Sequence, residues 1–547
     1  MNTIESAYDE TTPVLIVGGS LVGLSTALFL AWHGIPALLV ERHADISPHP
    51  RAFNFNMRTM ELFRSVGAEA AIRQAEPPEY RNSSVLQAES LAGKELHWIS
   101  QDTTASELSH VQGSLTGQDV MEPILRARAE ELGCDLRFHT ELVSFAQDTS
   151  GVSALICDRT SGTEYTVRAR YLIAADGHRG TIRQQLGIGV QGPGVQGHQI
   201  SLLFSANIAE ALRGRRIAIC FVNNPIIQGG TLILARGEGR GYSLYAHYHP
   251  EQGEQEEDFM KERGIALVRG ALGIADLPIE ISNVTPWEVA AWTAERFQHD
   301  NIFLVGDAAH VTPPAGAFGA NTGIADAYNL AWKLAFVLNG HAHPSLLKTY
   351  TEERQPVAQF TVEQAFSMFA RFASPTMRKQ AAPIVDYAAV AFGYRYHSAT
   401  LPFDIEEPAH YENPHQPSGH PGTHAAHVWL EREGKLYSTL DLFGRHCVLL
   451  AGAEGGGWCK AAQRLAERLN HPLDVYQIGQ EGDLADPSGQ FLAAYNINAS
   501  GAVLVRPDGF IGWRSARTDP CSERVLERGL MTMLSYPARQ AYLDDVA

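Results

Sequence analysis

"VLIVGGSLVGLS", residues 14–25, has the form of an apolar strand, a glycine-rich turn and the start of a helix. The stretch follows the dinucleotide-binding pattern Gly-x-Gly-x-x-Gly, except that Ser20 stands at the middle glycine. Gly18 permits the tight turn, and Gly23 lets the helix pack close to the strand. The N–H groups at the start of such a helix favour a pyrophosphate. Glu41 ends the next apolar run, 18 residues past Gly23, where a carboxylate would bind ribose hydroxyls.

A second stretch, "GPGVQG" at residues 192–197, satisfies the same glycine pattern as text. It contains a proline, precedes the strand-like run "HQISLLF" and opens no helix. We therefore expect a loop here, and the dinucleotide-binding turn at residues 18–23.

Length, charge and cysteine spacing narrow the class of protein. A chain of 547 residues predicts roughly two to four domains. The net charge of −18 comes without a long basic run, which argues against nucleic acid or an anionic membrane as partner. Residues 13–40 carry no charge, but glycines and Pro36 interrupt the run, so we expect a buried strand, helix and strand there. The six cysteines lack metal-site spacing, so we expect reduced thiols in a cytoplasmic protein without a membrane segment.

Two later stretches also place an Asp and a Gly directly after an apolar strand. "YLIAADGHRGTIRQQLGI", residues 171–188, has Asp-Gly at 176–177 and then a helix. "NIFLVGDAAHVTPPAGAFGANTGIADAYNLAWKLA", residues 301–335, has Gly-Asp at 306–307, a loop rich in proline and glycine, and a long helix. Each could be an ordinary turn after a strand. Their order after the first glycine motif favours a shared cofactor site.

With these motifs in this order, the chain resembles the group A flavoprotein aromatic hydroxylases, which share the p-hydroxybenzoate hydroxylase fold. The likeness covers essentially the whole chain and is greatest to bacterial hydroxylases that tailor aromatic polyketides such as anthracyclines, angucyclines and tetracyclines. It implies an α/β fold with a Rossmann-like FAD domain, an α+β substrate domain built on an antiparallel sheet, and a C-terminal thioredoxin-like domain. The expected FAD domain comprises residues 1–80, 105–190 and 296–405, the substrate domain 81–104 and 191–295, and the C-terminal domain 406–547.

The resemblance also assigns the FAD site. Asp307, at the end of a strand, would accept hydrogen bonds from ribityl hydroxyls, and Gly316 and Gly319 would leave room for the flat isoalloxazine ring. A helix starting near Asn321 would direct its N–H groups at flavin N1 and O2. The Asp-Gly motif at 176–177 is associated in the family with both FAD and NADPH. The expected cofactor residues are Gly18, Ser20, Leu21, Val22, Gly23, Glu41, Arg42, Arg51, Gln118, Arg126, Asp176, Gly177, Asp307, Pro313, Gly316, Gly319, Ala320 and Asn321.

Strand-like runs between the Asp-Gly and Gly-Asp motifs predict a mostly antiparallel sheet, which by the resemblance forms the roof of the substrate site. The implied reaction is hydroxylation of a phenolic, polycyclic substrate by O2 through a C4a-hydroperoxyflavin, after transient binding of NADPH. Arg395 in "FGYRYHS" is the catalytic candidate, because a cation would favour the substrate phenolate; a surface ion pair is the alternative for it. The aromatic residues of the sheet would suit a planar ligand or would fill the core: Phe204, Phe221, Tyr242, Tyr245 and Tyr248.

After the Pro-, His- and Gly-rich segment 406–422, strand and helix patterns alternate as in a small α/β domain. "GWCKAAQ" lies where a thioredoxin carries Trp-Cys-x-x-Cys, but Ala462 replaces the second cysteine. Cys459 alone cannot cycle a dithiol, so we expect a structural role or a role in assembly. The histidines in and after this segment have no suitably spaced acidic or cysteine partner, so no metal site is expected at His415, His420, His424 and His427.

Other functions stay open at this point. An enzyme of the same fold could perform Baeyer–Villiger oxidation or epoxidation, or could inactivate an antibiotic. A flavin halogenase is disfavoured, because Trp287 and Trp292 do not form the motif Trp-x-Trp-x-Ile-Pro. A non-catalytic flavin- or ligand-binding protein is a further alternative, and the sequence leaves open whether the chain forms a homodimer.

Overall fold

The first glycine motif folds into the strand, turn and helix that its pattern predicts. In the computed structural model, which describes residues 8–47, 51–77, 83–99, 107–234, 241–371, 375–401 and 409–537, β1 (Glu10–Val17) leads into α1 (Leu21–Trp32). Ser20 is the N-cap residue of α1, and β2 (Ala37–Glu41) pairs parallel to β1. The described residues contain no helix with both the length and the hydropathy that crossing a membrane requires.

Parallel pairing in the first sheet brings the three motifs to one edge. The strand order is β14-β15-β8-β1-β2-β5, and β7 and β6 continue beside β8. Because β15, β8, β1 and β2 are parallel neighbours, the residues that follow each of them lie side by side. The further strands are β5 (Asp135–Phe138), β6 (Thr140–Asp148), β7 (Gly151–Asp158), β8 (Thr163–Ala174), β14 (Gln298–His299) and β15 (Ile302–Leu304).

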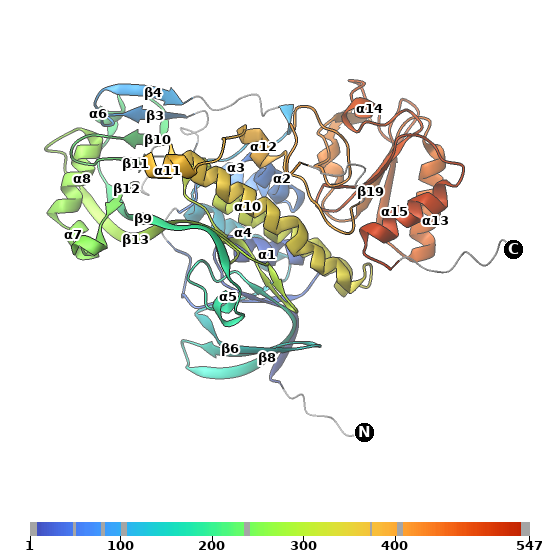
Figure 1. The fold of residues 1–547 in the computed structure, drawn as a ribbon, viewed down its shortest axis with the longest axis horizontal. Helices are drawn as coiled ribbons and strands as arrows, with labels where there is room; N and C mark the ends of the chain where they lie inside the picture. The colour runs from blue at the N-terminus through green and yellow to red at the C-terminus, as the bar shows by residue number, and fades with distance from the viewer. Residues whose placement is uncertain are drawn as a thin grey trace.

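A second sheet is mostly antiparallel, with the order β16-β13-β9-β12-β11-β10-β3-β4. In Figure 1 it lies at the left of the molecule, with α7 and α8 on its outer side. Its strands are β3 (Ser84–Ala88), β4 (Glu95–Ile99), β9 (Val190–Ser205), β10 (Ile217–Val222), β11 (Gly230–Ile233), β12 (Tyr242–Tyr248), β13 (Glu280–Ala294) and β16 (His310–Val311).

The loop predicted for "GPGVQG" is wrong, because residues 192–197 lie inside β9. This part of β9 pairs antiparallel with β13, and the register shifts where Gly194 and Gly197 face it. Gly192 and Gly194 have φ of +133° and +75°. Glycines at such irregular points of the pairing interrupt the alternation of residues from which a strand is predicted. No helix follows residues 192–197, as predicted, so this glycine pattern does not form a dinucleotide-binding turn.

Long helices join the parts of the molecule. α1 packs against α4 and α9, and α10 packs against both α9 and β13. Figure 1 shows α10 running from the second sheet to the C-terminal domain. The other helices are α2 (Met57–Ser65), α3 (Glu69–Ala75), α4 (Gln118–Glu131), α5 (Ile182–Gln185), α6 (Ala209–Leu212), α7 (Glu256–Phe259), α8 (Glu262–Leu272), α9 (Phe318–Leu338), α10 (Thr349–Ala370), α11 (Pro375–Gln380) and α12 (Tyr387–Ala391).

The C-terminal domain has the topology of a thioredoxin-like fold, as predicted. Its sheet has the order β20-β19-β21-β22, with β20 parallel to β19 and the other pairs antiparallel. α13 connects β19 to β20, and α15 follows β22 and packs against α13. The elements are β17 (Trp429–Arg432), β18 (Lys435–Ser438), β19 (Cys447–Ala451), α13 (Gly456–Leu469), β20 (Leu473–Gln477), α14 (Phe491–Ala494), β21 (Ala502–Val505), β22 (Ile511–Ser515) and α15 (Ser522–Met533).

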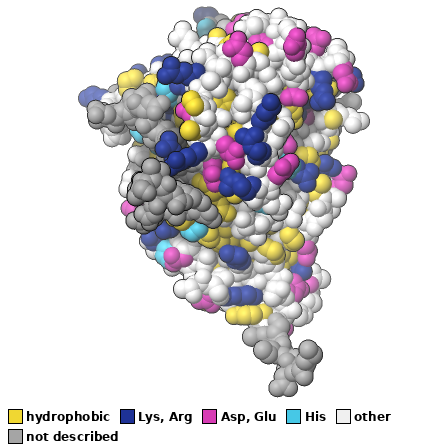
Figure 2. All heavy atoms as spheres, turned by 90° about the vertical axis from the view of Figure 1, so that its right-hand side faces the viewer, with side chains coloured by type: hydrophobic (Ala, Val, Ile, Leu, Met, Phe, Trp, Pro, Cys, Tyr) yellow, Lys and Arg dark blue, Asp and Glu magenta, His cyan; other side chains and the backbone are white. Residues whose placement is uncertain are grey.

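Charges of both signs are mixed on the surface that carries this domain. Figure 2 shows Lys and Arg side chains lying among Asp and Glu side chains there. In the described ranges, no group of three or more His, Cys, Asp or Glu side chains could hold a metal ion.

Candidate active site

The turn after β1 is so tight that two of its positions accept only glycine. Gly18 has a φ of +112°, and a Cβ there would lie 2.3 Å from the carbonyl oxygen of Ala175. A Cβ on Gly23 would lie 1.8 Å from the carbonyl oxygen of Gly18. The start of α1 therefore approaches the turn as closely as the glycine motif requires.

Ser20 joins this turn to α4. Its hydroxyl donates to Glu122 Oε1 at 2.7 Å and accepts from Gln118 Nε2 at 3.0 Å. Gln118 also donates to Glu122 Oε1 at 2.7 Å, and its Oε1 accepts from the backbone N of Ala52 at 3.3 Å. Burial raises the pKa of Glu122, and these donors oppose that effect. Sequence reasoning named Gln118 but missed Glu122, although it lies one helical turn further along.

Glu41 closes the first turn from the end of β2. Its Oε2 accepts from the backbone N of Gly19 at 2.6 Å, and its Oε1 accepts from the backbone N of His43 at 2.8 Å. Arg42 follows as an exposed residue. Arg126, predicted as a cofactor residue, lies over the ring of Phe138 at 4.2 Å and pairs with Glu130 at 3.0 Å.

The Asp-Gly turn after β8 carries a carboxylate that can accept further hydrogen bonds. Asp176 Oδ2 accepts from the backbone N of Ile182 at 3.2 Å. Its Oδ1 is buried and has no hydrogen-bond partner among the described residues. Burial raises the pKa of Asp176, while the nearby charges of Arg183 and Arg42 act to lower it. Gly177 has a φ of +77°, which suits glycine.

A buried ion cluster of Asp326, His310 and Arg354 supports the Gly-Asp turn after β15. Gly306 has a φ of +57°, and its N donates to Asp326 Oδ2 at 3.2 Å. The same oxygen lies 2.6 Å from His310 Nε2, and Arg354 Nε donates to Asp326 Oδ1 at 2.7 Å. Burial alone would raise the pKa of Asp326, but the charges of Arg354 and His310 outweigh it and lower the pKa. Asp307 itself is exposed, so its carboxylate can face a ligand.

This cluster was missed by sequence reasoning. His310 and Asp326 both lie in the stretch that drew attention to Asp307, but Arg354 lies outside it. The available signal was that Asp326 interrupts the apolar residues of a long predicted helix. That signal does not show that Arg354 is its partner.

The loop after β16 makes a sharp approach to α9. Gly316 and Ala317 have φ of +78° and +55°, and α9 begins at Phe318, three positions before the predicted start. Asn321 Oδ1 accepts from the N of Asn56 at 3.0 Å, which ties α9 to the segment that carries Arg51. Of the remaining predicted residues here, Pro313 is buried, and Gly319 and Ala320 are half-buried.

Val22 connects the first and third turns. A Cβ on Gly306 would lie 2.9 Å from Val22 Cγ2, so the two turns are in direct contact. Leu21 is buried in the same region. Arg51 is exposed, and its charge acts on both Glu122 and His178, which places it between the first turn and the Asp-Gly turn. These predicted residues therefore form one continuous region.

The residues fit a bound FAD. The glycine at position 18 leaves the start of α1 next to the backbone of the neighbouring strand end, where only backbone atoms lie within 3.2 Å of a Cβ. The Phe318 ring and the Thr312 hydroxyl lie 2.3 and 2.8 Å from a Cβ at Gly316 and Gly319, so each of these two positions also requires glycine. Asp176 offers a buried carboxylate oxygen without a partner among the described residues, and Asp307 offers an exposed one. Two carboxylates and a helix N-terminus along one sheet edge suit a ligand with hydroxyl and phosphate groups.

Register assigns two faces to the second sheet. Leu86, Cys220, Leu232, Leu244 and Leu202 align across it and form a core with α7 and α8. The opposite face carries the aligned residues Gln87, Phe221, Thr231, Tyr245 and Ser201.

The aromatic residues predicted for the substrate divide between these faces. Phe204 and Tyr242 pair on the face toward α7 and α8, and Tyr248 packs on Phe259 of α7. These three belong to the core, which was the alternative reading. Phe221 and Tyr245 lie on the opposite face, where Phe221 is 40% exposed. Trp287 joins them, because its ring meets that of Tyr245 at 5.8 Å and its Nε1 donates to Ser201 Oγ at 3.0 Å.

Arg395 lies in the segment between α12 and the C-terminal domain. It is buried, its N donates to the carbonyl of His410 at 2.9 Å, and its charge acts on Glu412. The Nε of Arg395 is buried without a partner among the described residues. The catalytic role of Arg395 stays a prediction.

Cys459 lies near the start of α13, where a thioredoxin has its first cysteine. Burial raises the pKa of Cys459 to about 11, so the thiol stays protonated near neutral pH. Ala462, one turn further along, is buried in the core. The site therefore does not favour thiol–disulfide exchange.

Comparison with known proteins gives consistent matches along the chain. Residues 11–365 match the model of the FAD binding domain family, and residues 418–537 match the model "Aromatic-ring hydroxylase, C-terminal". A 4-methyl-5-nitrocatechol 5-monooxygenase of Burkholderia sp. is 42% identical, over 97% of this chain and 99% of that protein. A tetracenomycin A2 monooxygenase-dioxygenase of Streptomyces glaucescens is 40% identical, over 92% of this chain and 94% of that protein.

A solved structure matches at the level of the whole fold. Aklavinone-11 hydroxylase, in a ternary complex with FAD and aklavinone, superposes with a TM-score of 0.91 at 36% identity and covers 98% of this chain and 100% of its own. The predicted fold and the predicted resemblance are thereby confirmed. The chain belongs to the FAD-binding aromatic-ring hydroxylases and is a flavin-dependent monooxygenase of that family.

Proposed function

We propose that the chain hydroxylates a phenolic, polycyclic aromatic compound of the polyketide type in the cytoplasm, with NADPH as the transient reductant and O2 as co-substrate. The observation that carries this proposal is the face of the second sheet with Phe221, Tyr245 and Trp287, which is aromatic and only partly buried. Such a face suits a flat ring system. The relatives named for tetracenomycin and aklavinone support a substrate of this class.

FAD, when bound, activates O2 and delivers one oxygen atom to the ring. The residues around it bind, orient and exclude water. In this proposal the start of α1 binds the pyrophosphate, Glu41 and Asp307 accept hydrogen bonds from hydroxyls, and Arg395 stabilises the substrate phenolate.

We also propose the division into an FAD domain, a substrate domain and a C-terminal domain with the boundaries given above. In support, strands of the first sheet come from residues 10–41, 135–174 and 298–304, and strands of the second sheet come from the alternating segments 84–99, 190–294 and 310–311. Because the chain passes from one sheet to the other and back again, each of the two domains is built from several separate segments.

A smaller substrate is the second candidate. The Burkholderia relative is named for a nitrocatechol with a single ring, and it is as similar along its whole length as the polyketide enzymes. The same site in this chain could therefore take a substituted catechol. Baeyer–Villiger oxidation or epoxidation would use the same cofactor residues, so the product distinguishes these reactions.

The test is stopped-flow reduction of the purified holoprotein by NADPH, with hydroxylated anthraquinones, with nitrocatechols and without a ligand. We expect flavin reduction to be accelerated most by an anthraquinone, with one oxygen atom added to the product by mass spectrometry. Acceleration by nitrocatechols alone would favour the second candidate. Equal reduction rates with and without every ligand would contradict a substrate-gated hydroxylase, and so would NADPH oxidation without an oxygenated product.

A further inference from the structure

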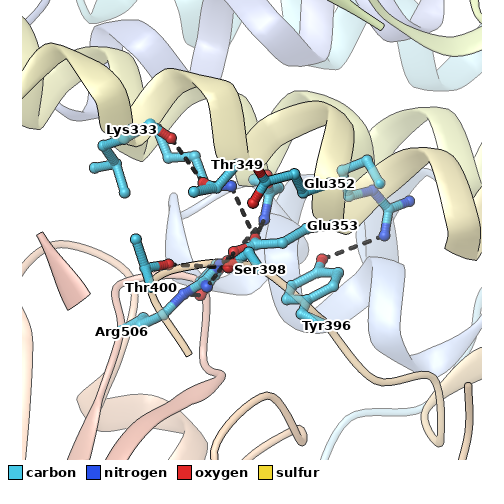
Figure 3. Close-up of polar contacts among 12 residues, drawn as sticks. Lys333, Thr349, Glu352, Glu353, Tyr396, Ser398, Thr400 and Arg506 are labelled. Carbon is cyan, nitrogen blue, oxygen red and sulfur yellow. Dashed lines mark hydrogen bonds and ion pairs between the residues drawn. The ribbon is translucent and has the colours of Figure 1, made fainter. Parts of the chain in front are cut away.

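One short turn of the C-terminal domain enters the helical part of the molecule. Arg506, at the start of the β21–β22 turn, donates to both carboxylate oxygens of Glu353 on α10, at 2.7 and 2.8 Å. Lys333 of α9 donates to the same carboxylate at 2.8 Å. Figure 3 shows Arg506 and Lys333 meeting Glu353 from different elements. All three side chains are buried, so the ion pairs are shielded from water and hold the turn on α10.

The next residue of α10, Arg354, contacts residues on the side of the proposed cofactor site. Arg354 Nε donates to Asp326 Oδ1 at 2.7 Å, and Arg354 Nη2 donates to the carbonyl of Thr322 at 3.1 Å. Asp326 accepts from the backbone N of Gly306, the first residue of the Gly-Asp turn. Two consecutive residues of α10 thus contact the C-terminal domain and the support of that turn.

Tyr396 forms a second connection between the C-terminal domain and Arg354, which supports the Gly-Asp turn. Its hydroxyl accepts from Arg354 Nη1 at 3.2 Å, and its ring stacks on Phe510 with centroids 4.0 Å apart. Its backbone N donates to the carbonyl of Gly422 at 2.8 Å, and the N of Gly422 donates to Ile511 of β22 at 2.8 Å. Tyr396 is therefore held on one side by the C-terminal domain and holds Arg354 on the other.

We propose that the β21–β22 turn, through Phe510 and Tyr396, positions the Gly306–Asp307 turn for FAD. Tyr396 is then a positioning residue for the cofactor, and the C-terminal domain takes part in cofactor binding without touching the cofactor. The inference rests on the proposed placement of FAD at Asp307 and is independent of which substrate the enzyme uses. Removing the Tyr396 hydroxyl would leave a buried N–H of Arg354 without its acceptor and loosen its hold on Asp326.

The experiment compares Tyr396→Phe and Phe510→Leu with wild type, and Tyr495→Phe serves as the matched control. Tyr495 is also buried, and its hydroxyl donates to the carbonyl of Ala426 at 2.9 Å within the C-terminal domain. The full chain is stripped of FAD and titrated with it, and the dissociation constant is read from the quenching of flavin fluorescence. The visible absorption and circular dichroism of the bound flavin are recorded for each variant, together with the Tm of each apoprotein.

We expect Tyr396→Phe and Phe510→Leu to raise the dissociation constant for FAD by about 3- to 10-fold and to alter the spectrum of the bound flavin. Tyr495→Phe should lower the Tm of the apoprotein and leave the dissociation constant and the spectrum unchanged. Wild-type affinity in Tyr396→Phe would overturn the proposal, and so would an equal loss of affinity in Tyr495→Phe. If Asp307→Ala, with no other change, binds FAD as tightly as wild type, the placement of FAD at Asp307 is wrong and the proposal falls with it.

Discussion

Gly18 is the residue on which the first turn depends most directly. Its φ of +112° lies where a side chain is strained, and a Cβ would lie 2.3 Å from the carbonyl oxygen of Ala175. Gly34, just past α1, has a φ of +73° but no heavy atom within 4 Å of a Cβ. The two glycines share the backbone requirement, and only Gly18 adds a collision with the neighbouring strand.

Gly18→Ala should therefore abolish the turn, whereas Gly34→Ala should cost only backbone strain. We expect Gly34→Ala to lose about 1 kcal/mol of unfolding free energy and keep its FAD. Gly18→Ala should lose more than twice that and purify largely without FAD. The ratio of flavin to protein absorbance and the Tm measure the two effects. A yellow, fully loaded Gly18→Ala protein would contradict the assignment of this turn to the cofactor.

At this scale, local geometry could be predicted from sequence and distant partners could not. Gly18, Gly23 and Glu41 stand in one motif of strand, turn, helix and strand, so their spacing is informative by itself. The partner of Ser20 is Glu122, 102 positions away, and nothing near either residue reveals the pairing.

Within a strand, alternate residues serve different purposes. In β12, Leu244 lies in the core with α7 and α8, and Tyr245 lies on the opposite face beside Trp287. Neighbouring positions of one strand therefore separate stability from the proposed contact with substrate.

Leu244→Ala should mainly lower the stability of the protein, whereas Tyr245→Ala should mainly raise KM for the substrate. Leu244→Ala removes fully buried methyl groups and should cost about 2–5 kcal/mol of unfolding free energy, with KM unchanged at a temperature where the protein is folded. Tyr245→Ala should lower the Tm little and should raise KM for a polycyclic substrate by about tenfold. Thermal unfolding and steady-state kinetics on both variants make the comparison. An unchanged KM in Tyr245→Ala would remove this face from the substrate site.

The faces of this sheet could not be predicted from the sequence. β12 carries Tyr242 and Tyr248 on one face and Tyr245 on the other, so aromatic character alone does not distinguish the two. The register shifts between β9 and β13 further interrupt the alternation. The sheet itself was predictable, because each run of alternating residues is long enough to indicate a strand.

Across the whole molecule, neutral histidines lie where the C-terminal domain meets the rest of the chain. His471 is buried, and its ring contacts those of Phe336 and His341 at 5.6 and 5.7 Å. Burial lowers the pKa of His471 to about 4, and it also lowers the pKa of His427, beside His110, to about 4. These rings pack against the other part of the molecule in their uncharged form.

Acid should therefore weaken this interface before it protonates the buried carboxylates of Asp326 and Glu353. In the unfolded chain a histidine has a pKa near 6.5, so as pH falls below about 6.5 protons bind the unfolded form first. Stability is then lost as pH falls toward about 4, the pKa of His471 in the folded protein. Asp326 and Glu353 have lowered pKa values, so the stability that they contribute is lost only at still lower pH.

His471→Gln tests this directly, with His415→Gln at an exposed position as the control. We expect the wild-type Tm to fall between pH 7 and pH 5.5, with His471 contributing about 1 kcal/mol of the loss at pH 5.5. His471→Gln should start from a lower Tm at pH 7, because packing is lost, and should then fall less steeply with acid. His415→Gln should follow the wild-type curve. The measurement is thermal unfolding across this pH range, and parallel curves for wild type and His471→Gln would show that the interface does not exclude the charged ring.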